Sequence, residues 1–461
     1  MSAVKTVAVI GAGPVGLAAA AHLLERGLDP VVLEAGPAVG HAMRQWSHVR
    51  LFSPWGYNVD KAAGRLLAPT GWNSPEPQAY PTGGELVESY LAPLATLTAL
   101  KDRIRTQARV TGIGRVGLDK VKTVGRAQAP FELRYRNGAG EATLLADAVI
   151  DCSGTWFSPN PAGASGLPAI GEDLAKDRIA YGMPDVLGAQ RVRYAGKAVA
   201  VLGAGHSAAG TLIDLATLAR EVPETRIIWL LRGGDPAKSF GGGANDKLAA
   251  RGAVGLMLAD LVAKGSLRVE TSFRVTRIES AEPGLRIAAT MAGDTREVMA
   301  DELIVATGFR PDLGFLKELR LGLDPALECP PALAPLIDPN EHSCGTVRPH
   351  GAQELAQPEP NFYIAGMKSY GRAPTFLMLT GYEQVRSIAA ELVGDRKAAR
   401  RVELVLPETG VCSVSASAPA SGCCGGPPPS EASACCAADE TARQAGIGGC
   451  AAQDGGCDPK S

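Results

Sequence analysis

The sequence predicts an α/β fold of two Rossmann-like domains, the second inserted into the first, followed by a disordered tail rich in cysteine. One observation is a repeat. A short apolar strand, a Gly-x-Gly turn, an Ala- and Leu-rich helix and a second apolar strand occur from Lys5 and again from Lys197. A further apolar segment, NFYIAG from Asn361, then follows the second copy. From Pro407 onward Ala, Gly, Ser, Pro and Cys dominate and the periodicity ends.

These patterns divide the chain into four parts. We expect the first domain in two parts, the inserted domain between them and the tail last: 1–160, 195–310, 311–400 and 407–461. Both copies close with a similar strand and turn, AVIDCSG ending at Gly154 and LIVATG ending at Gly308. A helical pattern from about Pro374 ends at Gly394.

Composition limits the partners and the compartment. A formal net charge of -2 gives no reason to expect a nucleic-acid surface. No stretch runs long enough without Gly, Pro or charge to suggest a membrane span. Only Cys152, Cys329 and Cys344 of the ten cysteines precede residue 400, which favours a reduced, cytoplasmic protein.

The first glycine-rich turn reads Gly-Ala-Gly-Pro-Val-Gly over residues 11–16. Gly11 allows the tight turn, Gly13 lets the backbone approach a pyrophosphate, and Gly16 lets helix and strand pack closely. We expect Pro14 to belong to the same cofactor site. Glu34 ends the second strand eighteen residues after Gly16, where a carboxylate binds a ribose diol. This position fits FAD and NAD equally.

The second turn reads Gly203-Ala-Gly205-His206-Ser207-Ala. An alanine at its last position is compatible with NADP binding. The following strand ends in Arg232, whose planar fork suits a 2′-phosphate, so this turn predicts NADPH rather than NADH. We expect Ser207 to cap the helix at the pyrophosphate and His206 to neighbour the nicotinamide nucleotide, with no role as acid or base.

Two dinucleotide sites in one chain suggest that electrons pass from a nicotinamide to a flavin. Over about residues 1–400 the chain resembles the two-dinucleotide-binding flavoproteins, which include flavin-containing monooxygenases and thioredoxin reductases. The two glycine turns, Glu34, Arg232 and the segment ATGFRPD carry this resemblance. It implies FAD in the first domain and NADPH in the inserted one.

Within that superfamily, disulfide reductases need a closely spaced cysteine pair beside the flavin. No CxxC or CxxxxC pair precedes the tail, and we expect Cys152 to fill a buried slot. The segments VGHAMRQW and YPTGGELVESYL also resemble the monooxygenase branch. The chain departs from that branch, because it lacks FxGxxxH before the second turn and has Gly366-Met367 where a Gly-Asp pair binds the ribityl chain.

The segment GMKSYGRAPTFLMLTGYEQVRS resembles FAD/NADPH monooxygenase-like proteins encoded with arsenic-resistance genes. Thiolates are soft ligands that bind thiophilic ions such as trivalent arsenic. The tail holds seven cysteines, and its two adjacent pairs are candidate metalloid ligands: Cys423, Cys424, Cys435 and Cys436. Incidental or protective thiols, or a redox role, remain alternatives for this tail.

The sequence therefore predicts an FAD- and NADPH-dependent monooxygenase. It would use oxygen on a small soft nucleophile, with a trivalent arsenical as one candidate and metalloid resistance as the context. No protein side chain is expected as a catalytic acid or base, because the chemistry is centred on the flavin. Two alternatives remain: an NADPH-dependent flavoprotein reductase without oxygen insertion, and a metalloid-sequestering protein.

Overall fold

The protein is described by a computed structural model over residues 4–243, 246, 248–291, 294–340, 347–373 and 376–404. Its first sheet is parallel, with strand order β16-β7-β1-β2-β3. The strands are β1 (Thr6–Ile10), β2 (Asp29–Leu33), β3 (Ile104–Arg105), β7 (Ala148–Asp151) and β16 (Phe362–Ile364). Helix α1 (Pro14–Glu25) connects β1 to β2, as the repeat predicts.

The second sheet is also parallel, with order β11-β10-β9-β15-β8. Its strands are β8 (Ile179–Tyr181), β9 (Ala198–Leu202), β10 (Arg226–Leu230), β11 (Arg268–Glu270) and β15 (Glu302–Val305). All five lie between β7 and β16 along the chain, so the inserted arrangement is confirmed. Because β8 belongs to this sheet, the inserted domain takes in residues before the predicted bound of 195. The other domain bounds remain predictions.

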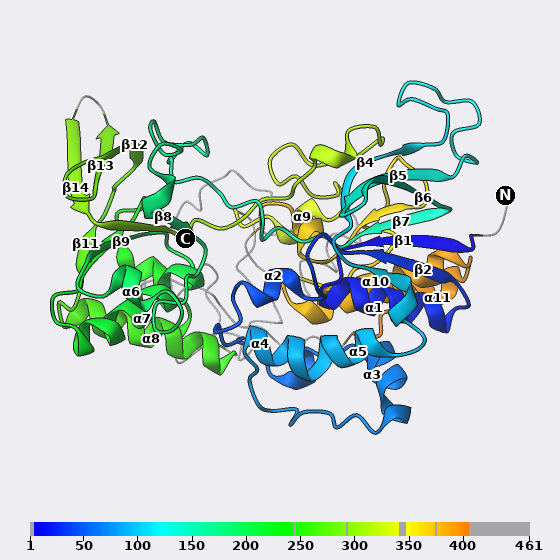
Figure 1. The fold of residues 1–461 in the computed structure, drawn as a ribbon, viewed down its shortest axis with the longest axis horizontal. Coiled ribbons are helices and arrows are strands. Elements are labelled where there is room, and N and C mark those ends of the chain that lie inside the picture. Colours follow the sequence, from blue (N-terminus) through cyan, green and yellow to red (C-terminus); the bar gives the residue numbers. More distant parts are fainter. Residues whose placement is uncertain are drawn as a thin grey trace, which may run out of the picture. The chain divides into compact units, whose positions relative to one another are not determined.

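Each parallel sheet carries helices on one face and a three-stranded antiparallel sheet on the other (Figure 1). On the first sheet, residues of β1 alternate: Val7 and Val9 pack with α1 and α10, whereas Ala8 and Ile10 pack with the small sheet. This alternation follows from the twofold side-chain period of a strand. The small sheet comprises β4 (Arg109–Arg115), β5 (Phe131–Asn137) and β6 (Gly140–Ala146), and the principal helices are α1, α3 (Lys61–Leu67) and α10 (Met378–Leu392).

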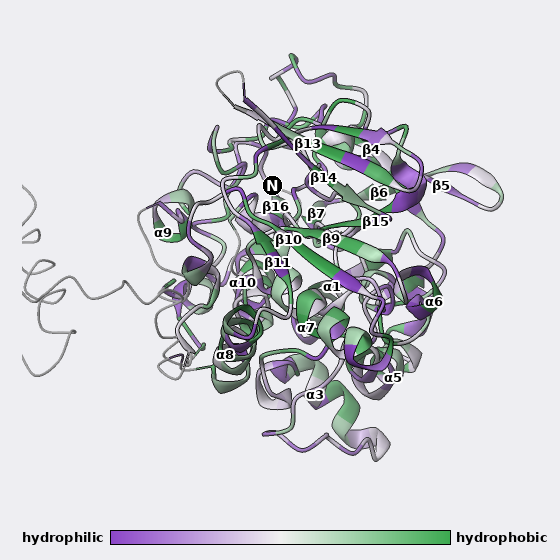
Figure 2. Cartoon of the chain, turned by 90° about the vertical axis from the view of Figure 1, so that its left-hand side faces the viewer, coloured by the Kyte–Doolittle hydropathy of each residue, from purple (hydrophilic) through white to green (hydrophobic). Residues whose placement is uncertain are grey.

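The inserted domain repeats this layering. Val199 and Val201 of β9 pack with helices, whereas Ala200 and Leu202 pack with the second small sheet. Hydrophobic residues accordingly dominate β9 (Figure 2). The covering elements are α7 (His206–Glu221), α8 (Ala249–Ala263), β12 (Val275–Ser280), β13 (Leu285–Met291) and β14 (Asp294–Ala300).

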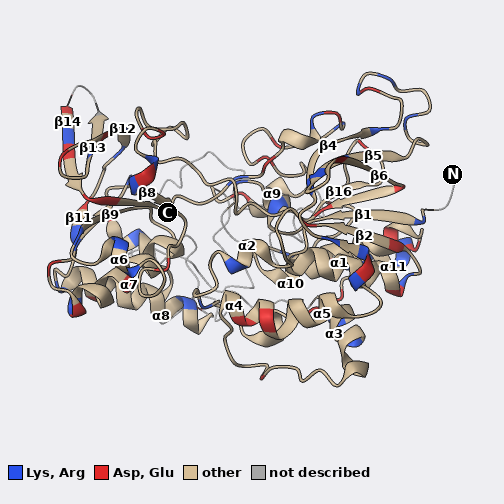
Figure 3. Ribbon diagram, in the orientation of Figure 1, with Lys and Arg blue, Asp and Glu red and all other residues tan. Residues whose placement is uncertain are grey.

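Shorter helices connect these layers: α2 (His41–Arg44), α4 (Gly83–Leu86), α5 (Ala92–Thr96), α6 (Arg191–Tyr194), α9 (Ala334–Ile337) and α11 (Arg396–Arg400). Charged residues of both signs are interspersed in the two domains (Figure 3). Within the described part of the chain, no helix has both the length and the apolar character needed to cross a bilayer. The predicted tail from residue 407 lies outside the described residues.

The chain crosses between the domains twice, and the two crossings pair with each other. The backbone amide of Asn160 donates to the carbonyl of Gly308 (2.9 Å), and the backbone amide of Arg310 donates to the carbonyl of Ser158 (2.9 Å). The side chain of Asn160 also donates to the carbonyl of Thr307 (3.0 Å). These bonds fix the turns that follow β7 and β15 against one another.

A buried carboxylate, Glu359, joins the β4–β6 sheet to the segment before β16. It accepts hydrogen bonds from Arg115 (2.8 Å) and Arg126 (2.6 and 3.0 Å), and all three side chains are at most 4% exposed. Burial opposes ionisation of Glu359, but the bonds from Arg126 and Arg115 outweigh it and hold its pKa below the ordinary 4.5. The ionised Glu359 therefore stabilises the fold in full above pH 4.5, the pKa of glutamate in the unfolded chain. This stabilisation is lost as the pH falls through the lower pKa that Glu359 has in the folded protein.

Replacing Glu359 by glutamine should lower the free energy of unfolding by about 3 kcal/mol at neutral pH, because two buried cations lose their counter-charge. The loss should shrink at acid pH. Urea denaturation at several pH values checks both expectations. As a control, Glu141→Gln removes an exposed pair with Arg136 (66% and 74% exposed) and should change the stability by less than about 1 kcal/mol. Equal effects of the two variants would contradict the assignment.

Candidate cofactor and active site

The first glycine-rich turn lies between β1 and α1 and depends on two glycines for packing. Gly11 has φ +96°, and a Cβ there would lie 2.8 Å from the carbonyl oxygen of Cys152. A Cβ on Gly16 would lie 1.9 Å from the carbonyl oxygen of Gly11. Neither position accommodates a side chain, so both glycines are required by the fold itself.

Gly13 is different, because it faces open space. A Cβ on Gly13 would meet no protein atom within 4 Å, and its backbone (φ -82°, ψ -173°) suits any residue. Gly13 is also the N-cap of α1 and offers no side-chain cap, so the first amides of α1 remain available to an anion. Open space before an uncapped helix that begins at Pro14 fits a dinucleotide pyrophosphate.

Glu34 follows β2 directly and is held beside this turn. Its two carboxylate oxygens accept 2.7 Å hydrogen bonds from the amides of Ala12 and Gly36, and the residue is 8% exposed. These bonds orient the carboxylate and leave its remaining lone pairs to accept from ribose hydroxyls. The geometry is compatible with the role predicted for Glu34.

The segment after β16 comes to the same place. Gly366 begins a short helical turn, η9 (Gly366–Tyr370), with φ +72°. A Cβ on Gly366 would lie 3.3 Å from the side chain of Val15, in the first turn of α1. The structure therefore brings Gly366-Met367 together with the first turn. Helix α10 begins at Met378, later than predicted, and Pro374 lies outside the described residues.

The second turn repeats the geometry of the first. Gly203 has φ +148°, and a Cβ there would lie 2.4 Å from the carbonyl oxygen of Ala306. Gly205 is the N-cap of α7 without a side-chain cap, and a Cβ on it would meet nothing within 4 Å. Ser207 thus lies in the first turn of α7 but does not cap it, which corrects the predicted capping role; Gly205 occupies the cap position.

Arg232 lies one residue beyond the position that corresponds to Glu34. The backbone amide of Glu34 donates to the backbone carbonyl of Arg105 in β3. In the same way, the backbone amide of Leu231 donates to the backbone carbonyl of Glu270 in β11. The second site therefore has a buried leucine where the first has a carboxylate. The exposed side chain of Arg232, next along the chain, donates one long bond (3.5 Å) to the carbonyl of Ala164. The position that corresponds to Glu34 thus carries no acid in the second site, and Arg232 lies next to it.

His206 opens α7, and its ring lies 5.3 Å from that of Phe52, which comes from the first domain. Desolvation and nearby Arg251 lower the pKa of His206, so the ring is neutral near pH 7. Aromatic side chains that the sequence analysis did not single out continue this contact between the domains. Trp156 lies 4.9 Å from Phe309 and 6.3 Å from Trp46, measured between ring centroids.

A fully buried ion pair also escaped sequence reasoning. Lys368 Nζ lies 2.6 Å from Asp151, both side chains are 0% exposed, and Nζ also contacts the hydroxyl of Ser153 (3.1 Å). The pair fastens the segment after β16 to the end of β7, next to the first turn. Two features of the sequence could have indicated this pair. Asp151 is a charged residue at the end of an apolar strand, and Lys368 lies two residues after Gly366.

The thiols of the described residues form no redox pair. Cys152 and Cys329 are both free and buried. Burial raises the pKa of Cys152 well above its usual value, and Asp151 adds to this. Burial raises the pKa of Cys329 as well. Such thiols are poor nucleophiles. Cys344 and the candidate metalloid ligands Cys423, Cys424, Cys435 and Cys436 lie outside the described residues.

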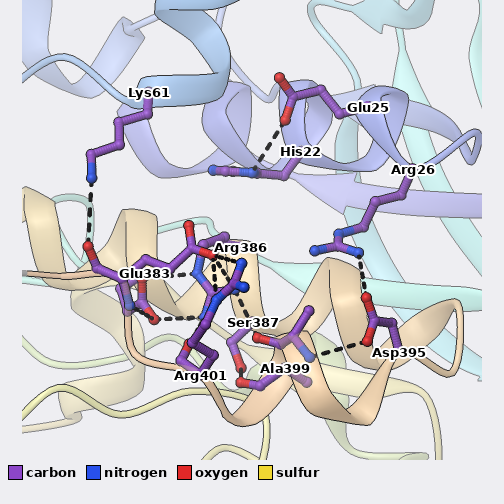
Figure 4. A network of polar contacts seen from close by, with 12 residues as sticks. His22, Glu25, Arg26, Lys61, Glu383, Arg386, Ser387, Asp395, Ala399 and Arg401 are labelled. Atoms are coloured by element: carbon purple, nitrogen blue, oxygen red, sulfur yellow. Dashed lines mark hydrogen bonds and ion pairs between the residues drawn. The ribbon is translucent and has the colours of Figure 1, made fainter.

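A cavity of about 520 Å³ lies at the carboxyl-terminal end of α1, the other end of this helix from the first glycine-rich turn. Figure 4 shows polar side chains that line it, among them His22, Glu25 and Arg386. Its charged walls are paired with one another, including Arg65 with Glu25 (2.7 Å) and Arg386 with Glu383 (2.7 Å). Arg386 also donates to the carbonyl of Ala398 (2.9 Å). The bond from Arg386 to Ala398 fastens α11 to α10, and the pair of Arg65 with Glu25 joins α3 to α1, so we assign this cavity a structural role.

Comparisons with known proteins agree with the fold. Residues 8–328 match the family model of pyridine nucleotide-disulphide oxidoreductases. The flavin-containing monooxygenase FMO GS-OX-like 2 of Arabidopsis thaliana is 24% identical over 243 residues, which cover 47% of this chain and 48% of that protein. The match thus spans about half the length of this curated relative.

Solved structures share the architecture. The bacillithiol disulfide reductase Bdr from Bacillus cereus is 19% identical with a TM-score of 0.62, covering 84% of this chain and 98% of Bdr. The FAD-bound cadaverine monooxygenase DfoA from Erwinia amylovora is 14% identical with a TM-score of 0.58, covering 90% of this chain and 100% of DfoA. At these identities the likeness concerns the fold. From the family match, the chain belongs to the pyridine nucleotide-disulphide oxidoreductase family and is an oxidoreductase.

Proposed function

We propose that the protein is an FAD- and NADPH-dependent monooxygenase that acts on a small soft nucleophile. The observation that carries this proposal is the repeated turn: in each domain an open glycine caps a helix at the carboxyl end of a parallel sheet. Two such turns accommodate two dinucleotides. The likeness to an FMO-type relative and to an FAD-bound monooxygenase supports the choice of cofactors and of reaction.

The residues present fit these cofactors. Gly11, Gly13, Pro14 and Gly16 would present the first amides of α1 to the FAD pyrophosphate, and Glu34 would bind its ribose. Gly366 and Met367 would lie against the same molecule. Gly203, Gly205, His206, Ser207 and Arg232 would hold NADPH at α7. When bound, the flavin supplies the centre that accepts hydride from NADPH and passes electrons to oxygen. The protein orients both cofactors and excludes water.

Within the described residues, the thiols favour oxygen over a disulfide as the acceptor. A disulfide reductase needs a reactive cysteine pair beside its flavin, whereas the described cysteines are buried with raised pKa values. NADPH oxidation with labelled dioxygen and a panel of thioether, thiol, amine and trivalent metalloid substrates tests the proposal. Label in the product supports a monooxygenase. Product formed equally without oxygen indicates the reductase alternative, and absence of NADPH turnover indicates a sequestering protein.

Replacing Arg232 by alanine should raise the Michaelis constant for NADPH about tenfold and leave that for NADH nearly unchanged. One charge-assisted hydrogen bond is worth about 1.5 kcal/mol at an exposed site. The matched control is Arg226→Ala, because Arg226 is exposed at the opposite end of β10. Steady-state kinetics with both cofactors give the answer. A parallel change for NADPH and NADH would remove Arg232 from this role.

We further propose trivalent arsenic as a substrate candidate, because the tail is rich in thiols and holds two adjacent cysteine pairs. We propose the cytoplasm as the compartment, because only three of the ten cysteines precede residue 400. A chain that ends after Leu406 should keep its FAD and its maximal turnover but show a higher Michaelis constant for arsenite. Changing Cys423, Cys424, Cys435 and Cys436 to serine should reproduce most of this effect. Equal arsenite binding and equal turnover at low substrate in both chains would show that the tail does not capture the metalloid.

A further inference from the structure

A chain of buried hydrogen bonds runs from His350 to Gly366. The ring Nδ1 of His350 lies 3.0 Å from the carbonyl oxygen of Arg348, and Nε2 lies 2.9 Å from the side-chain nitrogen of Gln384. The side-chain oxygen of Gln384 accepts a 2.7 Å hydrogen bond from the amide of Gly366. His350 is 3% exposed and Gln384 is 0% exposed, so water cannot replace these partners.

The partners fix the protonation state of His350. A carbonyl oxygen only accepts, so Nδ1 must carry the hydrogen that faces Arg348. The Gln384 oxygen is committed to the amide of Gly366, so its NH₂ group points at Nε2, which must accept. The second hydrogen of that NH₂ group faces the hydroxyl of Ser369 (2.9 Å), which itself donates to the carbonyl of Gly366 (2.7 Å). The network is complete only when His350 is neutral.

A proton on Nε2 would place two donors face to face. To accept from the protonated ring, the Gln384 carboxamide would have to turn over, and it would then present NH₂ to the amide of Gly366. Gly366 would lose its acceptor at the point where it lies against Val15 of α1. One proton at His350 is therefore coupled to the position of Gly366 through Gln384, which lies 34 residues after His350 and 18 residues after Gly366.

His350 borders a cavity of about 320 Å³, and we expect protons to reach its ring by this route. Burial lowers its pKa below the ordinary 6.5, with opposing effects from the Arg348 carbonyl and Glu354 and a further lowering from the Arg348 charge. Glu383 of α10 also favours the proton, and the Tyr370 ring lies 5.7 Å away. The other charged residues that line this cavity are Glu391, Arg400 and Arg401.

We propose that His350 and Gln384 are positioning residues for the first cofactor: neutral His350 orients Gln384, which holds Gly366-Met367 against that cofactor, and protonation of His350 releases them. This inference rests on the proposed placement of FAD at the first glycine-rich turn. It adds a site of control that responds to acid.

The test is the FAD dissociation constant of wild type and Gln384→Glu, measured by flavin fluorescence between about pH 5 and pH 8, where histidine titrates. For wild type we expect FAD binding to weaken about tenfold at the acid end, as for loss of one buried hydrogen bond. A carboxylate at position 384 needs a donor from His350 and still accepts from Gly366. The pH dependence of Gln384→Glu should therefore reverse, with weaker binding as the pH rises.

Two further variants keep the test decisive. His350→Phe removes the titrating group and should bind FAD more weakly than wild type at neutral pH, with no acid limb. Ser387→Ala is the matched control, because Ser387 accepts a buried bond from Ala352 on the same helix and loop but does not contact Gly366. It should lower the melting temperature and keep the wild-type pH profile.

An acid limb that persists in His350→Phe would overturn the proposal, as would parallel profiles for wild type and Gln384→Glu. If Gln384→Glu does not fold, the pH dependence of FAD binding in His350→Phe, compared with that in Ser387→Ala, decides the question. Absence of FAD from the wild-type protein at every pH would instead overturn the proposed function. Bound FAD with an unaltered profile overturns only the positioning role.

Discussion

Replacing Gly13 by leucine should give a folded protein without FAD. A side chain at position 13 meets no protein atom within 4 Å, and the backbone there is extended, so the fold should tolerate it. The cost should be about 1 kcal/mol, because leucine is a poorer N-cap residue than glycine. The same side chain would occupy the space before the first amides of α1. Several hydrogen bonds to a charged pyrophosphate would be lost at about 1.5–3 kcal/mol each, so FAD affinity should fall at least about a hundredfold. Flavin absorbance of the purified protein measures this.

The internal repeat offers a matched control. Gly205→Leu places the same side chain before α7, also in open space, so that variant should stay yellow and lose reduction by NADPH. By contrast, Gly16→Leu forces a Cβ to 1.9 Å from the carbonyl oxygen of Gly11 and should impair folding. Full flavin occupancy in Gly13→Leu would mean that FAD is not bound at the first turn.

Replacing Lys368 by methionine should lower the free energy of unfolding by about 3–5 kcal/mol, because Asp151 would be left as an uncompensated buried charge. The side chains of the pair are 0% exposed and their charged atoms lie 2.6 Å apart. Chemical denaturation measures the loss. Because the pair holds the segment after β16 against the end of β7, FAD binding should weaken in the same variant.

The double variant Lys368→Met/Asp151→Leu should recover most of the lost stability, since a buried ion pair replaced by apolar groups is often neutral. An exposed pair gives the comparison: Lys264 and Asp260 are 67% and 55% exposed, so Lys264→Met should cost less than about 1 kcal/mol. If Lys368→Met is as harmless as Lys264→Met, the buried pair does not stabilise the fold.

The internal repeat allowed the fold to be predicted from the sequence. Glycine positions, strand ends and apolar periodicity are local signals, and they placed β1, α1, β9 and α7 correctly. The insertion followed from a later strand, now β16, that pairs with β7. Strand β8 was missed because three residues within a loop-rich stretch carry too little periodicity. The equivalence of Glu34 with Leu231 rather than Arg232 also needed the strand register.

The remaining features depend on residues that are far apart in the chain. Lys368 and Asp151 are separated by 217 positions, and His350 and Gln384 by 34. No local pattern links such partners, because packing of β16 and α10 brings them together. A lysine and an aspartate beside apolar strands indicate that each charge needs a partner when it is buried. Which residue is the partner depends on the tertiary structure.

The central claim is that two dinucleotide sites act in series, and one measurement tests it most directly. Purified protein is mixed with NADPH in the absence of oxygen, and the visible flavin absorbance is followed in a rapid-mixing instrument. The account predicts fast bleaching in the wild type, slower bleaching with NADH, and loss of fast bleaching by NADPH in Gly205→Leu with its flavin still bound. A protein without flavin, or equal bleaching of wild type and Gly205→Leu by NADPH, would contradict the account.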